Sequence, residues 1–263
     1  MLGPERQAKI LDELQRRGTV RVTLLSQMLN VSDMTIRRDL EALSRRGLVE
    51  KVHGGATRPR TSTDEPGFEA KSLRQLAEKR ALARAAAELV TPGMAIGVSA
   101  GTTTWTLVHR LRNIEGLTVV TNSIRIADVL HVSNGPRQSV VLTGGVRTPS
   151  DALVGPVAVS ALAQLHLDIV FLGVHGMTED AGFTTPNLLE ADTDQALVKA
   201  GRRLVVVADH TKWGTIGIRT IAHLHEADMV ITDDGLSDAA RSVLESHVRE
   251  VRIIPVDRSA EEI

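Results

Sequence analysis

Two adjacent arginines, Arg37 and Arg38, have the most readily interpreted chemistry in this chain. A guanidinium group is permanently charged, and its fork of donors fits both phosphate oxygens and the edge of guanine. The pair follows Ser32, which can cap a helix, and precedes Gly47, which favours a helix stop. This spacing predicts a helix over residues 33–46 that carries both arginines in its first half.

The apolar residues of this helix indicate which side chains point outward. Ile36, Leu40 and Leu43 lie at i, i+4 and i+7 and therefore form one buried stripe. Of the outward side chains, Thr35 and Arg38 are expected to contact base edges. The predicted DNA-binding set is Ser32, Met34, Thr35, Arg37, Arg38, Arg45, Lys51 and His53, with Arg37, Arg45, Lys51 and His53 expected on phosphates. The alternative is an ordinary solvated helix face, because arginine pairs are common on protein surfaces.

The segments around this helix predict a winged helix-turn-helix. An apolar periodicity over residues 10–14 indicates a first helix that ends at Gly18, and residues 23–29 indicate a second helix. Asn30 tolerates the left-handed conformation and can supply the turn before the recognition helix. The strands of the wing are expected at residues 19–22 and 48–52, turned by Gly54-Gly55.

A second kind of chemistry is predicted where small and hydroxyl side chains follow a β-prone run. Gly101, Thr102 and Thr103 directly precede a helical pattern that ends near Leu111. Backbone N–H groups, hydroxyls and the positive end of a helix together suit a phosphate group. We therefore expect a phosphate site at this turn.

The same type of loop recurs along the second half of the chain. Short β-prone runs alternate with helical patterns there, which predicts an α/β domain with a mostly parallel sheet. The strands are expected at residues 94–98, 117–121, 139–143, 168–173, 204–208, 229–232 and 251–255. Small or polar residues follow the first five, at 99–104, 121–123, 143–145, 173–176 and 209–212. Because ligands bind at the carboxyl ends of such strands, we expect one shared site for an anion.

Composition and missing motifs exclude several classes of protein. No Gly-Lys pair is present, which excludes a nucleoside-triphosphate P-loop, and the first loop does not spell the Gly-x-Gly-x-x-Gly of dinucleotide folds. The nine histidines are scattered, with only His223 and His225 closely paired, so we expect neither a metal nor a cofactor. Cysteine is absent, and neither a membrane span nor a signal peptide is recognisable. We therefore expect a cytoplasmic protein without a membrane partner.

Charge and composition divide the chain. Residues 1–60 hold 12 Lys and Arg against 7 Asp and Glu, a net +5, whereas residues 61–263 hold 19 against 25, a net −6. The basic excess thus lies in the predicted DNA-binding part. We predict a winged helix-turn-helix domain at residues 3–58, a linker at 59–67 and an α/β domain at 68–258. The α/β domain is expected to begin with a helical run over residues 68–90, with Leu73 and Leu82 among its packing residues.

With these motifs in place, the chain resembles the DeoR family of bacterial transcriptional repressors from about Pro4 to Pro255. The N-terminal likeness rests on Val31-Ser32, Thr35–Leu40, Gly47 and His53–Ala56. The C-terminal likeness rests on Gly101–Thr103, Thr121–Ser123, Gly144-Gly145, Gly173–Gly176 and Ala208–Lys212. The resemblance implies a small winged helix-turn-helix domain followed by an α/β sensor domain of the ribose-5-phosphate isomerase type.

The resemblance also implies roles for individual residues in sensing a phosphorylated sugar or a related metabolite. Gly101, Thr102 and Thr103 would hold the phosphate. Asn122, Gly144 and Gly145 would line the pocket with the Gly173 loop, and Glu190 and Lys212 would bind polar substituents. For Glu190, the neighbouring Asp192 and Asp194 also fit a solvated helix start.

The function implied is a repressor of carbohydrate-metabolism genes that binds double-stranded operator DNA and is controlled by such an effector. Reading two half-sites predicts a homo-oligomer, a dimer or a tetramer. One alternative is an isomerase-like enzyme tethered to DNA, with Glu190 as base and Lys212 as the cation, although Gly173–Gly176 lacks the adjacent acidic pair of isomerases with the related fold. Another, an architectural DNA binder without effector, leaves the polar strand ends unexplained.

Overall fold

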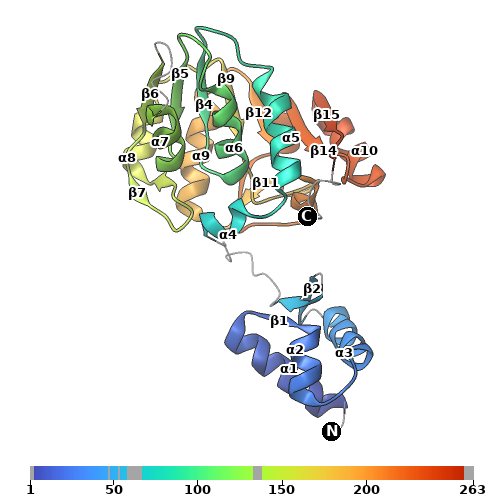
Figure 1. Ribbon diagram of the computed structural model, residues 1–263. Coiled ribbons are helices and arrows are strands. Elements are labelled where there is room, and N and C mark those ends of the chain that lie inside the picture. The colour runs from blue at the N-terminus through green and yellow to red at the C-terminus, as the bar shows by residue number, and fades with distance from the viewer. Residues whose placement is uncertain (1–2, 47, 53, 58–66, 133–137, 258–263) are drawn as a thin grey trace. The chain divides into compact units, whose positions relative to one another are not determined.

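The computed structural model describes residues 3–46, 48–52, 54–57, 67–132 and 138–257. The chain divides into two compact units, residues 1–61 and 62–263, and each unit is described by itself (Figure 1). The boundaries that we predict at residues 58 and 68 stay a prediction, because the 59–67 segment lies outside the described residues apart from Gly67. Within the described residues, no helix is both long enough and apolar enough to cross a membrane.

The described part of the N-terminal unit contains three helices, α1 (Gly3–Arg17), α2 (Val22–Leu29) and α3 (Asp33–Arg45). Gly18 ends α1 with a φ of 74°, and Asn30 joins α2 to α3 with a left-handed φ of 50°. Ile36, Leu40 and Leu43 of α3 are buried in one core with residues of α1 and α2. The predicted helix-turn-helix and its buried stripe are therefore confirmed.

The wing differs from the prediction by one strand. β1 (Thr19–Arg21), β2 (Glu50–Val52) and β3 (Gly55–Thr57) form an antiparallel sheet in the order β1-β3-β2. The two strands that we predicted therefore do not pair directly, because β3 lies between them. Gly54 turns the chain with a φ of 75°, whereas Gly55 belongs to β3 itself. A Cβ at Gly55 would lie 2.0 Å from the carbonyl oxygen of Val20, so a third strand fits here only without a side chain.

The C-terminal unit is built on a parallel seven-stranded sheet in the order β15-β14-β12-β9-β4-β5-β6. Its strands are β4 (Ala95–Val98), β5 (Thr118–Thr121), β6 (Ser139–Leu142), β9 (Ile169–Leu172), β12 (Leu204–Val207), β14 (Met229–Asp233) and β15 (Glu250–Ile254). All seven lie within one residue of the predicted bounds. The predicted fold class, a winged helix-turn-helix followed by an α/β domain, is confirmed.

Helices cover both faces of this sheet (Figure 1). On one face lie α5 (Leu76–Ala87), α6 (Thr102–Leu111) and α7 (Ile124–Val132). The other face packs against α8 (Pro156–Leu162), α9 (Leu188–Ala200) and α10 (Asp238–His247). Alternate residues of β9 point to opposite faces of the sheet. Phe171 packs in the core on the side of α5, α6 and α7, and Val170 packs in the core on the side of α8, α9 and α10. Because both faces of the central strands β9, β12 and β14 are buried, these strands are continuous apolar runs, which is why the sequence pattern located them.

Three features of this unit were not predicted. The helical run at 68–90 is broken into α4 (Phe68–Ser72) and α5, because Gln75 takes a left-handed φ of 50°, and Leu73 is 77% exposed instead of packed. β7 (Val146–Arg147) and β8 (Leu153–Val154) form a short hairpin. The third feature is a small antiparallel sheet of β10 (Gly176–Thr178), β11 (Gly182–Thr185) and β13 (Arg219–Ala222), next to the 3-10 turns η1 (His210–Lys212) and η2 (Leu224–Glu226).

Candidate functional site

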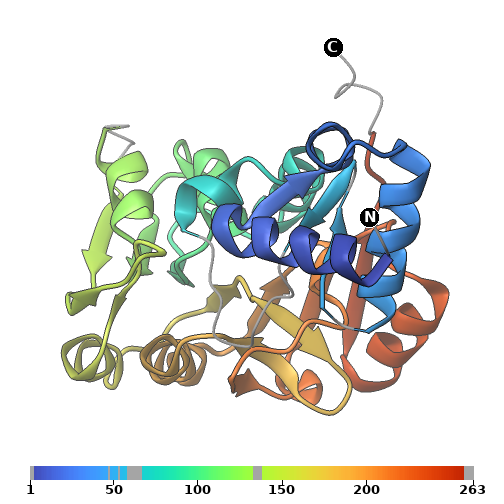
Figure 2. The ribbon, with the colours of Figure 1, turned by 90° about the horizontal axis from the view of Figure 1, so that it is seen from below.

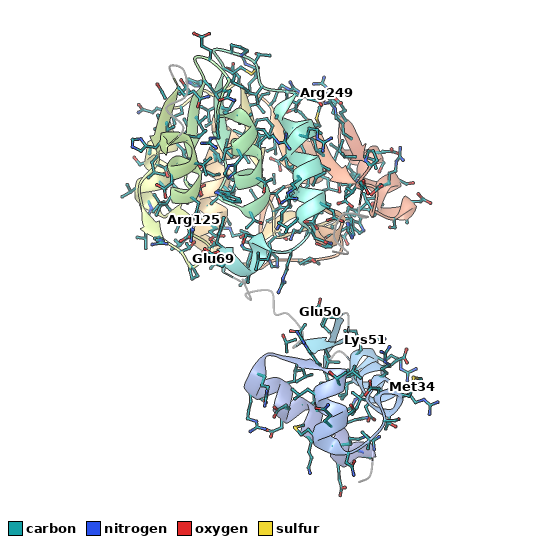
Figure 3. All side chains as sticks on the ribbon, in the orientation of Figure 1. Met34, Glu50, Lys51, Glu69, Arg125 and Arg249 are labelled. Carbon is teal, nitrogen blue, oxygen red and sulfur yellow. The ribbon has the colours of Figure 1, made fainter. Side chains whose placement is uncertain are left out.

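The outward surface of α3 carries the predicted DNA contacts. Arg37, Arg38 and Arg45 are all exposed. Met34, which is 60% exposed, and Lys51, which is exposed on β2, are labelled in Figure 3. Positions 34, 37, 38 and 45 share one helix face, opposite the buried stripe. This face can therefore meet a DNA groove without any rearrangement of the core.

The start of α3 is capped as predicted. Ser32 Oγ accepts a hydrogen bond from the Thr35 backbone N–H at 3.2 Å and lies 2.9 Å from Thr35 Oγ1. Both hydroxyls are thus engaged with each other, and Thr35 is only half-exposed. Gly47 and His53, which we also singled out, lie outside the described residues.

A buried ion pair that we did not predict fixes α3 to α1. Asp39 is 5% exposed and accepts hydrogen bonds from Arg6 Nη2 at 3.1 Å and from Gln7 Nε2 at 3.2 Å. The hydrogen bond to Asp39 raises the pKa of Arg6. Asp39 lies three residues after Ile36 on the buried face, and a carboxylate in that place requires a partner. An acidic residue on the apolar face of the helix was therefore the feature of the sequence that could have revealed this ion pair.

The predicted phosphate turn lies at the N-terminus of α6, directly after β4. Thr102 and Thr103 are 8% and 6% exposed, and among the described residues neither hydroxyl has a hydrogen-bond partner. By contrast, Thr104 Oγ1 donates to the Gly101 carbonyl at 3.0 Å, and Thr106 Oγ1 donates to the Thr102 carbonyl at 2.8 Å. Two hydroxyls and the first N–H groups of α6 thus remain for an anion.

Hydrogen bonds tie the neighbouring strand ends to this turn. Ser99 Oγ accepts from the Gly173 N–H at 2.9 Å, which joins the ends of β4 and β9. Asn122 Oδ1 accepts from the Ala100 N–H at 2.8 Å, which joins the ends of β4 and β5. β4 lies between β5 and β9 in the sheet, so the chain adds later strands on both sides of it. In open parallel sheets, ligands usually bind at the carboxyl ends of the strands at such a point. The structure therefore brings Gly101, Asn122 and Gly173 together.

Gly144 and Gly145 follow β6 and have a clear steric role. Both take positive φ values, 74° and 119°. A Cβ at Gly145 would lie 2.5 Å from the carbonyl oxygen of Val154. This glycine therefore allows the chain after β6 to pack against β8, which borders the loop of Asn122 through the Leu153 N–H to Asn122 carbonyl bond of 2.7 Å.

Glu190, near the start of α9, is buried rather than part of a solvated helix start. It is 7% exposed. Its carboxylate accepts hydrogen bonds from Thr148 Oγ1 at 2.9 Å, from Ser150 Oγ, and from Thr185 Oγ1 at 3.4 Å. Three hydroxyls thus surround the carboxylate, and two of them come from the hairpin loop between β7 and β8, which also contacts the Asn122 loop.

Lys212 lies after β12, on the opposite side of β9 from β4. Its Nζ is 4.0 Å from Asp209 Oδ2, and its side chain is 28% exposed. Asp209 caps the turn η1 by accepting from the Thr211 N–H at 3.0 Å, which explains the spacing of this motif.

The buried Lys79 of α5, which the sequence analysis did not single out, interacts electrostatically with Asp209 and Lys212. Desolvation lowers its pKa to about 8, against the opposing effect of Asp209.

Among the described residues, Glu78, His210 and Asp233 form a group whose spacing would allow a metal ion. The Asp233 carboxylate already accepts from the His210 N–H at 2.8 Å and from the Gly235 N–H at 2.9 Å, and its Oδ1 lies 2.6 Å from His210 Nδ1. These bonds give Asp233 a structural role, which is to hold the loop after β12 against the loop after β14.

A cavity of 670 Å³ lies elsewhere, between α8 and α9, which run side by side (Figure 2). Val159, Leu162 and Leu189 are among its lining residues, and none of the predicted effector-binding residues borders it. The predicted site is therefore defined by hydrogen-bonding groups at the strand ends and not by this cavity.

Two family models match the chain. Residues 6–62 match a model described as a DeoR-like helix-turn-helix domain, and residues 74–234 match one described as the DeoR C terminal sensor domain. The first match lies almost entirely in the N-terminal unit, and the second lies within the C-terminal unit.

Comparison with individual proteins gives matches along nearly the whole chain. It is 35% identical over 236 residues to the HTH-type transcriptional regulator GolR of Listeria innocua, covering 89% of this chain and 92% of that protein. It is 30% identical over 244 residues to the glycerol-3-phosphate regulon repressor of Escherichia coli K12, covering 92% and 96%. A solved ribose 5-phosphate isomerase A from Methanocaldococcus jannaschii is 17% identical, with coverage of 51% and 53% and a TM-score of 0.38. The relationship to known proteins therefore rests on the sequence comparisons.

Proposed function

Because the chain belongs to the DeoR family of helix-turn-helix transcriptional regulators, we propose that it represses carbohydrate-metabolism genes under the control of a phosphorylated sugar or a related metabolite. In this proposal α3 enters the major groove of operator DNA. Thr35 and Arg38 contact base edges, Arg37, Arg45, Lys51 and His53 contact phosphates, and Ser32 and Met34 lie at the entering end of the helix. The exposure of Arg37, Arg38, Arg45 and Lys51 supports this assignment.

The effector is proposed to bind at the carboxyl ends of β4, β5 and β9. Gly101, Thr102 and Thr103 hold its phosphate, and the remaining groups around it are Asn122, Gly144, Gly145, Gly173, Glu190 and Lys212. The observation that carries this proposal is the pair of Thr102 and Thr103 hydroxyls, which have no partner among the described residues and lie at the N-terminus of α6. The name of one relative, a glycerol-3-phosphate regulon repressor, supports a phosphorylated ligand.

The isomerase alternative is not favoured. The relatives are named as transcriptional regulators. Glu190, the residue nominated as its base, already accepts hydrogen bonds from three hydroxyls of the protein. We propose instead that Glu190 orders the β7–β8 loop beside the effector, in a protein that acts in the cytoplasm as a dimer or tetramer.

The test is a titration of operator DNA, selected from the source genome by binding to the full-length protein. Affinity is measured by fluorescence anisotropy with and without ribose 5-phosphate, fructose 6-phosphate, glucose 6-phosphate and glycerol 3-phosphate. At least one of these should change operator affinity by about 5- to 150-fold. Arg38→Ala should weaken specific binding by about 1–3 kcal/mol, because it removes a base-edge contact.

Matched variants separate the two halves of this proposal. Thr103→Val should bind DNA normally and lose the effector response. Thr106→Val, on the same helix but with a hydroxyl already bonded to backbone, should keep that response. Arg249→Ala controls for loss of an exposed arginine, since its side chain is 83% exposed in the C-terminal unit (Figure 3). Operator binding by Arg38→Ala as tight as the parent's would refute the DNA assignment, and an unchanged effector response in Thr103→Val would refute the phosphate site.

A further inference from the structure

α4 is the first helix that follows the N-terminal unit in the chain, and its first residues are held by contacts from α6 and α7. The Phe68 ring meets the Trp105 ring of α6 edge-on, with 5.7 Å between centroids. The Arg125 guanidinium of α7 lies 5.0 Å from the centre of the Phe68 ring. Arg125 Nη2 also donates to Glu69 Oε1 at 2.8 Å (Figure 3). A single side chain, Arg125, thus holds both residues.

Arg125 has a second carboxylate partner on the side of the candidate effector site. Its Nε donates to Asp151 Oδ2 at 2.7 Å, and Arg147 Nε donates to Asp151 Oδ1 at 2.7 Å. Burial raises the pKa of Asp151, but the hydrogen bonds from Arg125 and Arg147 outweigh this, so its pKa lies below the ordinary value. Asp151 is 6% exposed and takes a left-handed φ of 63° in the loop between β7 and β8. The two arginines hold this strained residue in place.

The loop of Asp151 is also the loop that contacts the proposed effector site. Thr148 and Ser150, which both precede Asp151 in this loop, donate to Glu190. Leu153 donates its N–H to the Asn122 carbonyl. One contact chain thus runs from Glu190 through this loop, Asp151 and Arg125 to Glu69.

Two further connections reach α4 from the same region. Trp105, which meets Phe68, lies in the first turn of α6, next to the proposed phosphate ligands. At the other end of α4, Lys79 Nζ donates to the Lys71 carbonyl, and Lys79 interacts electrostatically with Asp209 and Lys212. Both ends of α4 are therefore tied to residues that border the strand-end site.

We propose that α4 is the element that reports effector occupancy to the chain leading to the DNA-binding unit, with Arg125 coupling the site to it through Asp151 and Glu69. This inference rests on the proposed function. The Asp151 half of the bridge is buried, whereas Glu69 has a side chain 76% exposed. Because an exposed ion pair is weak, a small shift of the β7–β8 loop is sufficient to form or break the Arg125–Glu69 contact.

The test compares the full-length protein with Glu69→Gln by hydrogen-exchange mass spectrometry and operator titration. The probes are the four phosphates named above and inorganic phosphate. In the parent, the effective probe should slow exchange in peptides covering both residues 101–107 and 68–75. In Glu69→Gln it should slow exchange at 101–107 as in the parent but at 68–75 less than in the parent. The effector-dependent change in operator affinity should fall by about two- to fivefold, the effect expected for loss of one exposed ion pair.

Two controls keep the result specific. Glu245→Gln removes a comparable exposed pair, in which Arg241 Nε lies 2.7 Å from Glu245 Oε1 in α10, and should behave as the parent. Arg125→Lys keeps the charge but cannot bind two carboxylates at once, and should weaken the response at least as much as Glu69→Gln. A full effector response in Glu69→Gln, or protection in the parent at 101–107 without any at 68–75, overturns the role of α4 and leaves the proposed function standing. Absence of protection at 101–107 with every probe overturns the proposed function, and this inference with it.

Discussion

Lys79 is a buried cation whose protonation makes stability depend on pH. Desolvation, together with Lys212, Lys71 and Arg74, lowers its pKa from 10.5 to about 8, while Asp209 acts in the opposite direction. Between these two pKa values the unfolded chain binds a proton that the folded protein has released. The free energy of unfolding contributed by this group therefore rises with pH across that window, and the cost of the buried charge is fully present below pH 8.

We expect Lys79→Met to be more stable relative to the parent at neutral pH than at pH 10. Urea denaturation at a series of pH values, followed by circular dichroism, measures the difference. Arg80→Met, the exposed neighbour in α5, should differ from the parent by an amount that does not change over the same range, because its guanidinium stays charged. A pH-independent difference for Lys79→Met would contradict the assignment.

The three-stranded wing depends on one glycine. Gly55 lies in β3 opposite Arg21 of β1, and an added Cβ would lie 2.0 Å from the Val20 carbonyl oxygen and 3.1 Å from the Arg21 Cα. Since both are backbone atoms, the strands must separate to admit a methyl group. We expect Gly55→Ala to destabilise the wing by about 1–3 kcal/mol, seen as faster amide exchange at residues 19–21 and 55–57 and as weaker operator binding.

The adjacent glycine provides a contrast within the same turn. Gly54 has a φ of 75° and no atom within 4 Å of an added Cβ. Gly54→Asn should therefore be nearly neutral, because asparagine tolerates the left-handed region. Equal effects of the two substitutions would show that close approach of β1 is not what requires Gly55.

For the molecule as a whole, charge is concentrated where DNA binding is proposed, with a net +5 over residues 1–60 in a chain of net −1. Each phosphate neutralised contributes about −0.9 to the slope of log affinity against log salt concentration. Lys51, exposed on β2 (Figure 3), is a proposed phosphate contact. Lys51→Ala should therefore reduce the magnitude of this slope by about 1.8 if two half-sites are bound and by about 0.9 if one is bound.

Operator titrations over a range of sodium chloride concentrations give this slope and report the stoichiometry of bound domains. Arg249→Ala, which changes an exposed arginine of the C-terminal unit, should leave the slope unchanged. A Lys51→Ala slope equal to that of the parent would remove Lys51 from the phosphate contacts.

Local patterns in the sequence were sufficient for the elements. The stripe of Ile36, Leu40 and Leu43 predicted α3, and apolar runs predicted all seven strands of the parallel sheet. Burial of one helix face or of a strand makes apolar residues recur at regular spacings in the local sequence. The Gly-Thr turn was equally visible, since the end of a strand and the start of a helix impose local requirements.

The pairing of charged side chains and the arrangement of the wing depend on contacts between segments distant in the sequence, which no local pattern encodes. Asp39 pairs with Arg6, Glu190 with Thr148 and Ser150, and Arg125 with both Glu69 and Asp151. The third wing strand likewise depends on its pairing with β1, and the break at Gln75 separates two helices that both contact α6. Periodicity reports whether a side chain is buried, but the fold decides which hydrogen-bond donors or opposite charges come within reach of a charged group.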